Sequence, residues 1–179
     1  MNVQAILEDA YAKSRSYEAL NDDHPDPLLV AKNLPDDAAL ICALFSYGGF
    51  RNIVKFLKTL PFELLDESDQ VIKQKLNHYY RFQTREDLIA IFQGFAKLRR
   101  EQVKLKDIFE ETYRSDGFLH ALNALIFTVR GAVDRSSHGV EFFANHTFNP
   151  EKIAGVSANK RWMMFLRWMV RKSPPDFGR

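Results

Sequence analysis

The residue best placed to do chemistry is Lys160, which lies in a basic, aromatic segment near the end of the chain. Residues 157–172 carry five cations and no acid, together with both tryptophans of the protein. At the start of a helix, a lysine lies at the positive end of the helix dipole, and Arg161 places a second positive charge beside it. Both effects disfavour the protonated amine, and the neutral amine is the form that attacks as a nucleophile. The pattern therefore makes Lys160 the candidate catalytic residue.

Wound as a helix, residues 157–172 have one apolar face and one cationic face. The apolar residues that we expect in the core are Trp162, Met163, Leu166, Met169 and Val170. Lys160, Arg167 and Arg171 line up on the other side, with Met164 and Trp168 beside them. A cationic face with an aromatic at its edge suits an anionic, stackable partner such as nucleic acid. An ordinary buried helix with snorkelling arginines is the alternative, and this helix alone favours it.

A glycine-containing turn precedes this helix. Residues 153–160 read Ile-Ala-Gly-Val-Ser-Ala-Asn-Lys, which predicts a short helix, a tight turn and the start of the basic helix. Backbone N–H groups of such a turn, together with a helix N-terminus, form a phosphate site. The predicted phosphate contacts are the backbone of Gly155, Val156 and Ser157 and the side chains of Arg161, Arg167 and Arg171. The alternative is an ordinary connection between two helices.

Aromatic and basic side chains also alternate earlier in the chain, where residues 78–82 read His-Tyr-Tyr-Arg-Phe. Aromatic rings stack on bases and arginines hold phosphates, so Tyr80 and Arg81 are further predicted nucleic-acid contacts. More cations follow at Lys97, Arg99, Arg100, Lys104 and Lys106. The alternative is that the tyrosines cover the core and the cations form a solvated surface.

The sequence lacks the motifs of metal sites, of disulfide bonds, of serine hydrolases and of phosphate-binding loops. His138 and His146 are eight residues apart and share no helix face, so the histidines predict no metal site. Cys42 is the only cysteine and lies in an apolar run, which excludes an intrachain disulfide and all-cysteine metal sites. No Gly-x-Ser-x-Gly and no phosphate-binding Gly-x-x-x-x-Gly-Lys loop occurs. We therefore expect no metal and no cofactor.

The elements that must position these residues are helices. The 179 residues are 46% apolar with a net charge of only +2, and they show helical rather than alternating periodicity. This predicts an all-α, irregular multi-helix bundle of eight or nine helices in one domain, residues 1–179. A two-lobed arrangement, in which residues 1–35 and 150–179 pack together, stays open. The expected helices span about 3–20, 38–47, 50–60, 62–78, 84–100, 104–114, 117–131, 139–146 and 157–172.

Short motifs along most of the chain resemble an uncharacterised bacterial family of conserved hypothetical proteins. The motifs are Asp26-Pro27-Leu28, Tyr47-Gly48, Tyr79-Tyr80-Arg81-Phe82, Ser157-Ala158-Asn159-Lys160-Arg161, the run from Phe165 to Arg171, and Asp176-Phe177-Gly178.

The pattern Lys-x-x-x-x-Phe-Leu-Arg, which starts at Lys160, is also similar to the archaeal-type 8-oxoguanine DNA glycosylases. These belong to the helix-hairpin-helix base-excision superfamily, and their lysine attacks the sugar C1′ as the base leaves. The resemblance implies a helix-hairpin-helix, DNA-glycosylase-like fold, DNA as the partner, and Lys160 as the Schiff-base amine. Two positions of the hairpin depart from the usual pattern: Ala154 replaces a proline and Ser157 a glycine.

A second departure concerns the carboxylate that those glycosylases place after the lysine. Here the only acid after Lys160 is Asp176, which follows Ser-Pro-Pro without an apolar run, and we expect it to be a loop acid at the end of the helix. The similar bacterial family continues into a Pro-Leu-Asp-Thr-His segment. Either this chain is a truncated form that lacks the C-terminal helices, or it has lost the step that the aspartate performs. Apolar surface left by a short C-terminus would favour a homodimer.

The function that these patterns predict is a DNA-binding, base-excision glycosylase-like protein with a lysine nucleophile. The alternative is a non-catalytic α-helical module that binds nucleic acid or protein. The first residues lack the basic and apolar blocks of a signal peptide, and no uncharged apolar run approaches about 18 residues. We therefore expect a cytoplasmic protein without a membrane partner.

Overall fold

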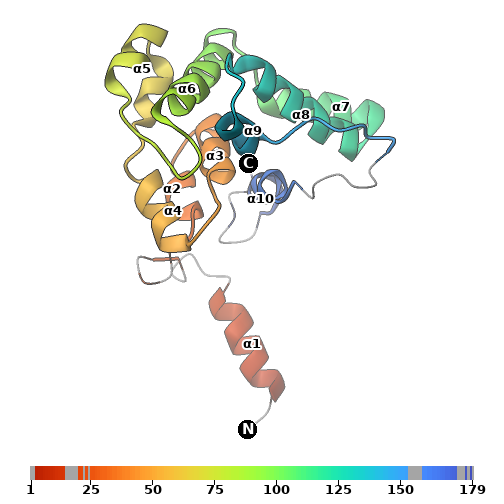
Figure 1. The fold of residues 1–179 in the computed structure, drawn as a ribbon. Coiled ribbons are helices and arrows are strands. Elements are labelled where there is room, and N and C mark those ends of the chain that lie inside the picture. Colours follow the sequence, from red (N-terminus) through yellow and green to blue (C-terminus); the bar gives the residue numbers. More distant parts are fainter. Residues whose placement is uncertain are drawn as a thin grey trace. The chain divides into compact units, whose positions relative to one another are not determined.

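A computed structural model describes residues 3–14, 20–21, 23, 25–152, 159–172, 176 and 178. Within these ranges the protein has ten α-helices, one 3-10 helix and no strand, which confirms the all-α prediction (Figure 1). The elements are α1 (Val3–Ser14), α2 (Leu28–Ala31), α3 (Asp36–Leu44), α4 (Phe50–Leu57), η2 (Phe62–Asp66), α5 (Asp69–Lys75), α6 (Arg85–Arg100), α7 (Leu105–Asp116), α8 (Phe118–Ala132), α9 (His138–Ala144) and α10 (Lys160–Val170).

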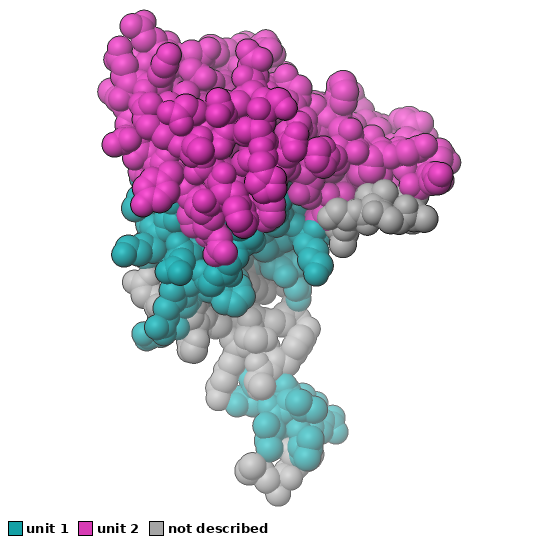
Figure 2. Space-filling view, viewed as in Figure 1, with its two compact units in different colours: residues 1–59, 160–179 teal, residues 60–159 magenta. Residues whose placement is uncertain are grey.

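The chain divides into two compact units, coloured separately in Figure 2. Unit 1 comprises Met1–Thr59 and Lys160–Arg179, and unit 2 comprises Leu60–Asn159. Unit 1 therefore joins the two ends of the sequence, whereas unit 2 is continuous. The predicted packing of residues 1–35 with residues 150–179 stays a prediction.

The core of unit 1 is built around α3. Every residue from Ala38 to Phe45 is inaccessible to solvent, as expected for a helix that is apolar all round. Asp36 and Asp37 lie in its first turn, where their charges complement the helix dipole. Helices α2 and α10 pack against α3. This packing fixes the helix that begins with Lys160.

The buried face of α10 differs in part from the sequence prediction. Trp162 and Leu166 are buried as expected, but Met163 is 37% exposed and Val170 is 71% exposed. Trp168, which the helical pattern placed beside the cations, is completely buried. After the helix, the chain contacts α10 again: the backbone N–H of Gly178 donates to the carbonyl of Trp168, at 3.1 Å. The end of the chain therefore returns to the side of α10 that an isolated helix would expose.

Unit 2 is organised around α6, which packs against η2, α5, α8 and α9. Its core residues include Leu88, Ile91, Phe92 and Phe95, all inaccessible to solvent. Helices α7 and α8 pack along each other and are joined by Gly117 alone, whose φ of 85° lies in the region that favours glycine. Residues 62–78, which were predicted to be helical, form two separate helices: η2 ends at Asp66, and α5 begins after Ser68 and ends at Lys75.

The N-terminus of α6 carries the most extensive buried polar network in the described part of unit 2. Thr84 caps the helix: its side chain accepts from the Asp87 N–H and the Asp87 carboxylate accepts from the Thr84 N–H. The same carboxylate, only 2% exposed, also accepts from Ser137 at 2.6 Å and from Arg135 at 2.5 Å. This carboxylate therefore ties the start of α6 to the segment before α9.

Hydrogen bonding also sets the ionisation of Asp87. Burial alone would raise the pKa of this carboxyl, but the hydrogen bonds from Ser137, Thr84 and Arg135 outweigh it, and its pKa lies below the ordinary value. A second bond joins the same segments, since the Gln83 side chain donates to the carbonyl of Gly139 at 2.8 Å. Residues 80–83 and α9 are thus held together by buried polar contacts.

Candidate functional site

Lys160 is the first residue of α10, and its side chain is exposed. The neighbouring Arg161 turns inward: it donates to the carbonyl of Leu44, and its guanidinium lies over the Tyr47 ring at 5.2 Å. Burial lowers the pKa of Arg161, an effect that the charge of Tyr47 opposes. Arg161, predicted to hold a phosphate, instead anchors the start of α10 to the end of α3.

Arg167 and Arg171 are one helical turn apart and share one acid. Arg167 lies 3.2 Å from Asp176 and Arg171 lies 3.6 Å from it. The Asp176 side chain is fully buried, whereas the side chains of Arg167 and Arg171 are 52% and 43% exposed. Asp176 lies after the end of α10, as expected for a loop acid, but its burial and its two arginine contacts were not expected. Because α10 presents both arginines to the returning end of the chain, this acid is buried between them.

The predicted phosphate grip at Gly155, Val156 and Ser157 lies outside the described residues. Asn159, which directly precedes Lys160, has a φ of 46° and is 4% exposed. The contribution of the turn before Lys160 thus remains a prediction from the sequence.

The second predicted site, around Tyr80 and Arg81, is a tight turn. Tyr80 and Gln83 exchange two backbone hydrogen bonds of 2.9 and 3.0 Å, and Arg81 takes a φ of 53°. Tyr80 is buried, and burial raises the pKa of its hydroxyl against the opposing charge of Arg81. Arg81 is exposed, as are Tyr79 (79%) and Phe82 (47%). The turn therefore presents Arg81 to solvent and uses Tyr80 in the core.

The row of cations that follows is largely paired with acids. Arg99 contacts Asp66 at 2.7 Å and Arg100 contacts Asp69 at 2.9 Å. These pairs join the end of α6 to η2 and α5, so the two arginines act in unit 2 as structural contacts at its surface.

An aromatic cluster that the sequence did not reveal lies beside the turn. The Phe82 ring centroid is 4.8 Å from that of Phe142 and 5.9 Å from that of His138, and Arg81 lies over Phe82 at 5.9 Å. The participants are about 60 residues apart along the chain. In the sequence, each of the two segments shows only that it is rich in aromatic residues. This does not predict that the rings of Phe82 and Phe142 contact each other.

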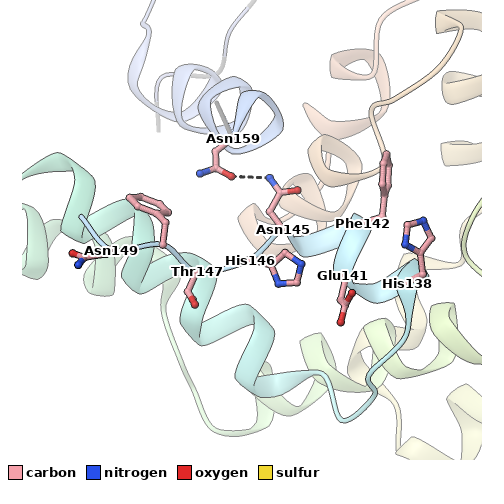
Figure 3. A pocket seen from close by; sticks show the side chains of 9 residues that line it. His138, Glu141, Phe142, Asn145, His146, Thr147, Asn149 and Asn159 are labelled. Carbon is pink, nitrogen blue, oxygen red and sulfur yellow. Dashed lines mark hydrogen bonds between the residues drawn. The ribbon is translucent and has the colours of Figure 1, made fainter. Parts of the chain in front are cut away.

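A pocket of about 490 Å³ opens next to this cluster, built from α9 and the residues after it (Figure 3). Its lining consists of His138, Glu141, Phe142, Asn145, His146, Thr147, Phe148, Asn149 and Asn159. His138 and His146 thus line one pocket although they share no helix face. In the ranges that the structure describes, no three histidine, cysteine or acidic side chains are placed to hold a metal ion.

The relationship to known proteins rests on one family model. It matches residues 26–179, and its description is protein of unknown function, DUF2400. The chain belongs to the DUF2400 family. This confirms the predicted relationship to an uncharacterised family, while the likeness to the glycosylases stays a prediction. No curated protein and no solved structure matches the chain. No helix of the DUF2400 domain, within the described residues, has the length and hydropathy that a membrane crossing requires.

Proposed function

We propose that this DUF2400 protein binds nucleic acid and that Lys160 acts as an amine nucleophile, as the resemblance to the glycosylases implies. The observation that carries the proposal is the placement of this lysine. Its side chain is exposed, while the two residues after it are anchored: Arg161 binds the Leu44 carbonyl and Trp162 is completely buried. An amine on a fixed backbone that remains accessible to a large substrate is what nucleophilic attack on a polymer requires.

In the proposed reaction, the Lys160 nitrogen forms a bond to the sugar C1′. The glycosidic bond breaks, and the base leaves with the bonding electrons and takes up a proton. Loss of the amine proton and opening of the sugar ring then give a Schiff base. Asp176 is not assigned as the base in this step, because its buried carboxylate is held by Arg167 and Arg171.

The charge of residues 159–172 supports an anionic partner. This segment contains five cations and no acid, and Lys160, Arg167, Arg171 and Lys172 are all exposed. Exposed cations that face no neighbouring acid on their own helix suit phosphate groups, and the resulting binding weakens with salt.

Borohydride trapping on DNA that contains an abasic site tests the nucleophile. We expect a covalent adduct with the wild-type chain, no adduct with Lys160→Gln, and an unchanged adduct with Lys55→Gln, which changes an exposed lysine of α4. No adduct with the wild type, or equal adducts with wild type and Lys160→Gln, would remove the catalytic part of the proposal. Salt-dependent binding to intact duplex and single-stranded DNA tests the binding part separately.

The exposed turn of unit 2 favours a second candidate, a non-catalytic nucleic-acid-binding module. Tyr79, Arg81 and Phe82 present two rings and one cation to solvent on a hydrogen-bonded turn, a combination that serves sequence-tolerant stacking. On this alternative, Tyr79→Ala and Arg81→Ala weaken DNA binding, and no variant or wild type forms the trapped adduct.

A further inference from the structure

The pocket beside α9 contains a buried amide with a free donor. Asn159 is 4% exposed, lines the pocket, and accepts a hydrogen bond on Oδ1 from Asn145 Nδ2 at 2.7 Å. Its own amide nitrogen is therefore directed away from Asn145 (Figure 3). Among the residues that the structure describes, this nitrogen has no hydrogen-bond partner. An amide N–H without a protein partner, on a residue that lines a pocket, is a group that a ligand can satisfy.

The backbone at both ends of this hydrogen bond is unusual. Asn145 has φ 62° and ψ 177°, a region populated almost only by glycine, and Asn159 has φ 46°. Neither residue is a glycine, so the surrounding structure must hold both conformations. Such backbone conformations cluster at binding sites, where they place side chains in fixed positions.

Aromatic walls accompany these polar groups. Phe142 and Phe148 both line the pocket. Phe142 is held by the Phe82 ring, and Phe148 by its backbone N–H, which donates to Asn123 of α8 at 2.8 Å. The segment that carries Phe148 is tied again to α8 by Glu151, which lies 3.3 Å from His120. The Phe142 ring and the backbone that carries Phe148 are thus fixed by protein contacts, which favours a stacking site.

The charge of the lining narrows the ligand class. Among the described lining residues there is no lysine or arginine and a single acid, Glu141, and these residues disfavour an anionic group such as a phosphate. The remaining polar groups can both donate and accept hydrogen bonds: Asn145, Asn149, Asn159, Thr147, His138 and His146. A volume of about 490 Å³ accommodates a planar ring with an attached sugar.

We propose that this pocket of unit 2 binds an uncharged heteroaromatic ring of the nucleobase class. The ring stacks on Phe142 or Phe148, and its hydrogen-bonding edge meets the asparagine amides, with the free Asn159 nitrogen donating to a ring or carbonyl acceptor. A free nucleoside and an unpaired base of a polynucleotide present the same ring. The proposal does not depend on Lys160.

Titration calorimetry of the full chain with adenosine, guanosine, cytidine and thymidine tests the pocket. We expect saturable binding that differs among the four nucleosides. Asn159→Ala and Phe148→Ala should each weaken it by about tenfold, the effect of losing one stacking or edge contact. Phe127→Ala, which removes a ring that is 70% exposed on α8, should leave it unchanged.

A second experiment distinguishes between a free nucleoside and an unpaired base of a polynucleotide as the ligand. Twelve-residue single strands of dA, dT and dC are compared with an abasic strand of equal length. If the polynucleotide is the source, base-containing strands bind more tightly than the abasic strand. If only free nucleosides are bound, the strands do not differ but nucleoside binding persists. Both results support the pocket.

A pocket-filling variant keeps the test decisive if Asn159→Ala fails to fold. Thr147→Trp places a large side chain at an exposed lining position and should abolish nucleoside binding with an unchanged thermal midpoint. The proposal is overturned if neither nucleosides nor strands bind in a base-dependent way, or if binding survives in both Thr147→Trp and Phe148→Ala. Lys160→Gln should leave nucleoside binding intact. The borohydride experiment therefore tests the Lys160 nucleophile, and the calorimetry tests the pocket, independently of each other.

Discussion

Asp87 in unit 2 and Asp176 in unit 1 are both buried carboxylates. Different sets of partners stabilise their charges. Asp87 accepts from two side chains and one backbone N–H at 2.5 to 2.9 Å, and each of these donors lies within its own unit. The contacts of Asp176 with its two arginines are longer, 3.2 Å to Arg167 and 3.6 Å to Arg171. Both carboxylates are inaccessible, yet their arginine partners remain partly exposed in both cases.

Because their partners differ, the removal of Asp87 and the removal of Asp176 should have different consequences. Removing Asp87 would leave the Thr84 N–H at the start of α6, the part-buried Ser137 hydroxyl and the Arg135 side chain without their common acceptor. Removing Asp176 would leave two arginines that can rehydrate in place. We therefore expect Asp87 to act mainly on stability and Asp176 mainly on the charge that α10 presents.

The largest expected effect is that of Asp87→Ala. This substitution removes the cap of α6 and the acceptor for Ser137 and Arg135, so the free energy of unfolding should fall by about 3 kcal/mol. Urea denaturation measures it. Asp134→Ala, an exposed acid close in sequence to Arg135, should change the value by less than about 0.5 kcal/mol. A loss below 1 kcal/mol for Asp87→Ala would contradict the comparison.

Gly139→Ala probes the same network by steric contact. A Cβ there would lie 2.5 Å from Asp87 Oδ2 and 2.8 Å from the Phe82 carbonyl, which is backbone. We expect a loss of about 2 kcal/mol in the free energy of unfolding, measured by urea denaturation. Gly131→Ala is the matched control, since no atom lies within 4 Å of its added Cβ in α8, and it should be neutral or stabilising. Equal effects of the two changes would argue against a tightly packed network.

Asp176→Asn should change stability by about 1 kcal/mol or less, because Arg167 and Arg171 are half exposed. Its expected effect lies in binding. With the carboxylate neutralised, both arginines can contact phosphates, so the affinity for DNA should rise and the slope of log K against log salt should steepen by about 1 to 2. Asp23→Asn makes the same change of charge at an exposed position of unit 1. If both variants shift the slope equally, Asp176 has no specific role.

The smallest effect is the pH dependence that Asp87 contributes. Its folded pKa is depressed, so its stabilisation is fully present above the ordinary carboxyl value of about 3.9 and is lost as the pH falls through the lower folded pKa. The difference in unfolding free energy between the wild type and Asp87→Asn should be constant from pH 7 to about pH 5 and shrink below about pH 4. A difference that grows with acidification would reverse the assigned sign.

Local signals predicted much of the helical framework. The Thr84–Asp87 capping box and the acids in the first turn of α3 are local patterns, because a cap and its helix are adjacent in sequence. Partners that lie far along the chain were not visible. Ser137 and Arg135 join Asp87 from about 50 residues away, and no feature of either segment specifies the other.

The sites were less predictable than the helices for the same reason. The helical pattern placed Trp168 beside the cations, but the structure buries this side chain completely. The pattern of one helix contains no information about the segment around Gly178, which contacts α10 at Trp168. It separated His138 from His146 by assuming one helix, whereas the positive φ of Asn145 ends α9 and redirects the chain. The pocket therefore depends on the change of chain direction after α9, which residue spacing along a single helix does not predict.

By itself, the sequence determined that this protein is helical, where most of its helices begin, and that an unusual concentration of cations follows residue 156. Those properties depend on residues within a few turns of one another. Only the tertiary structure decided what each cation faces: Arg161 a backbone carbonyl, Arg167 and Arg171 a buried carboxylate, and Lys160 solvent. An arginine has the same local signature in all of these settings, because its environment is set by segments that are distant in sequence.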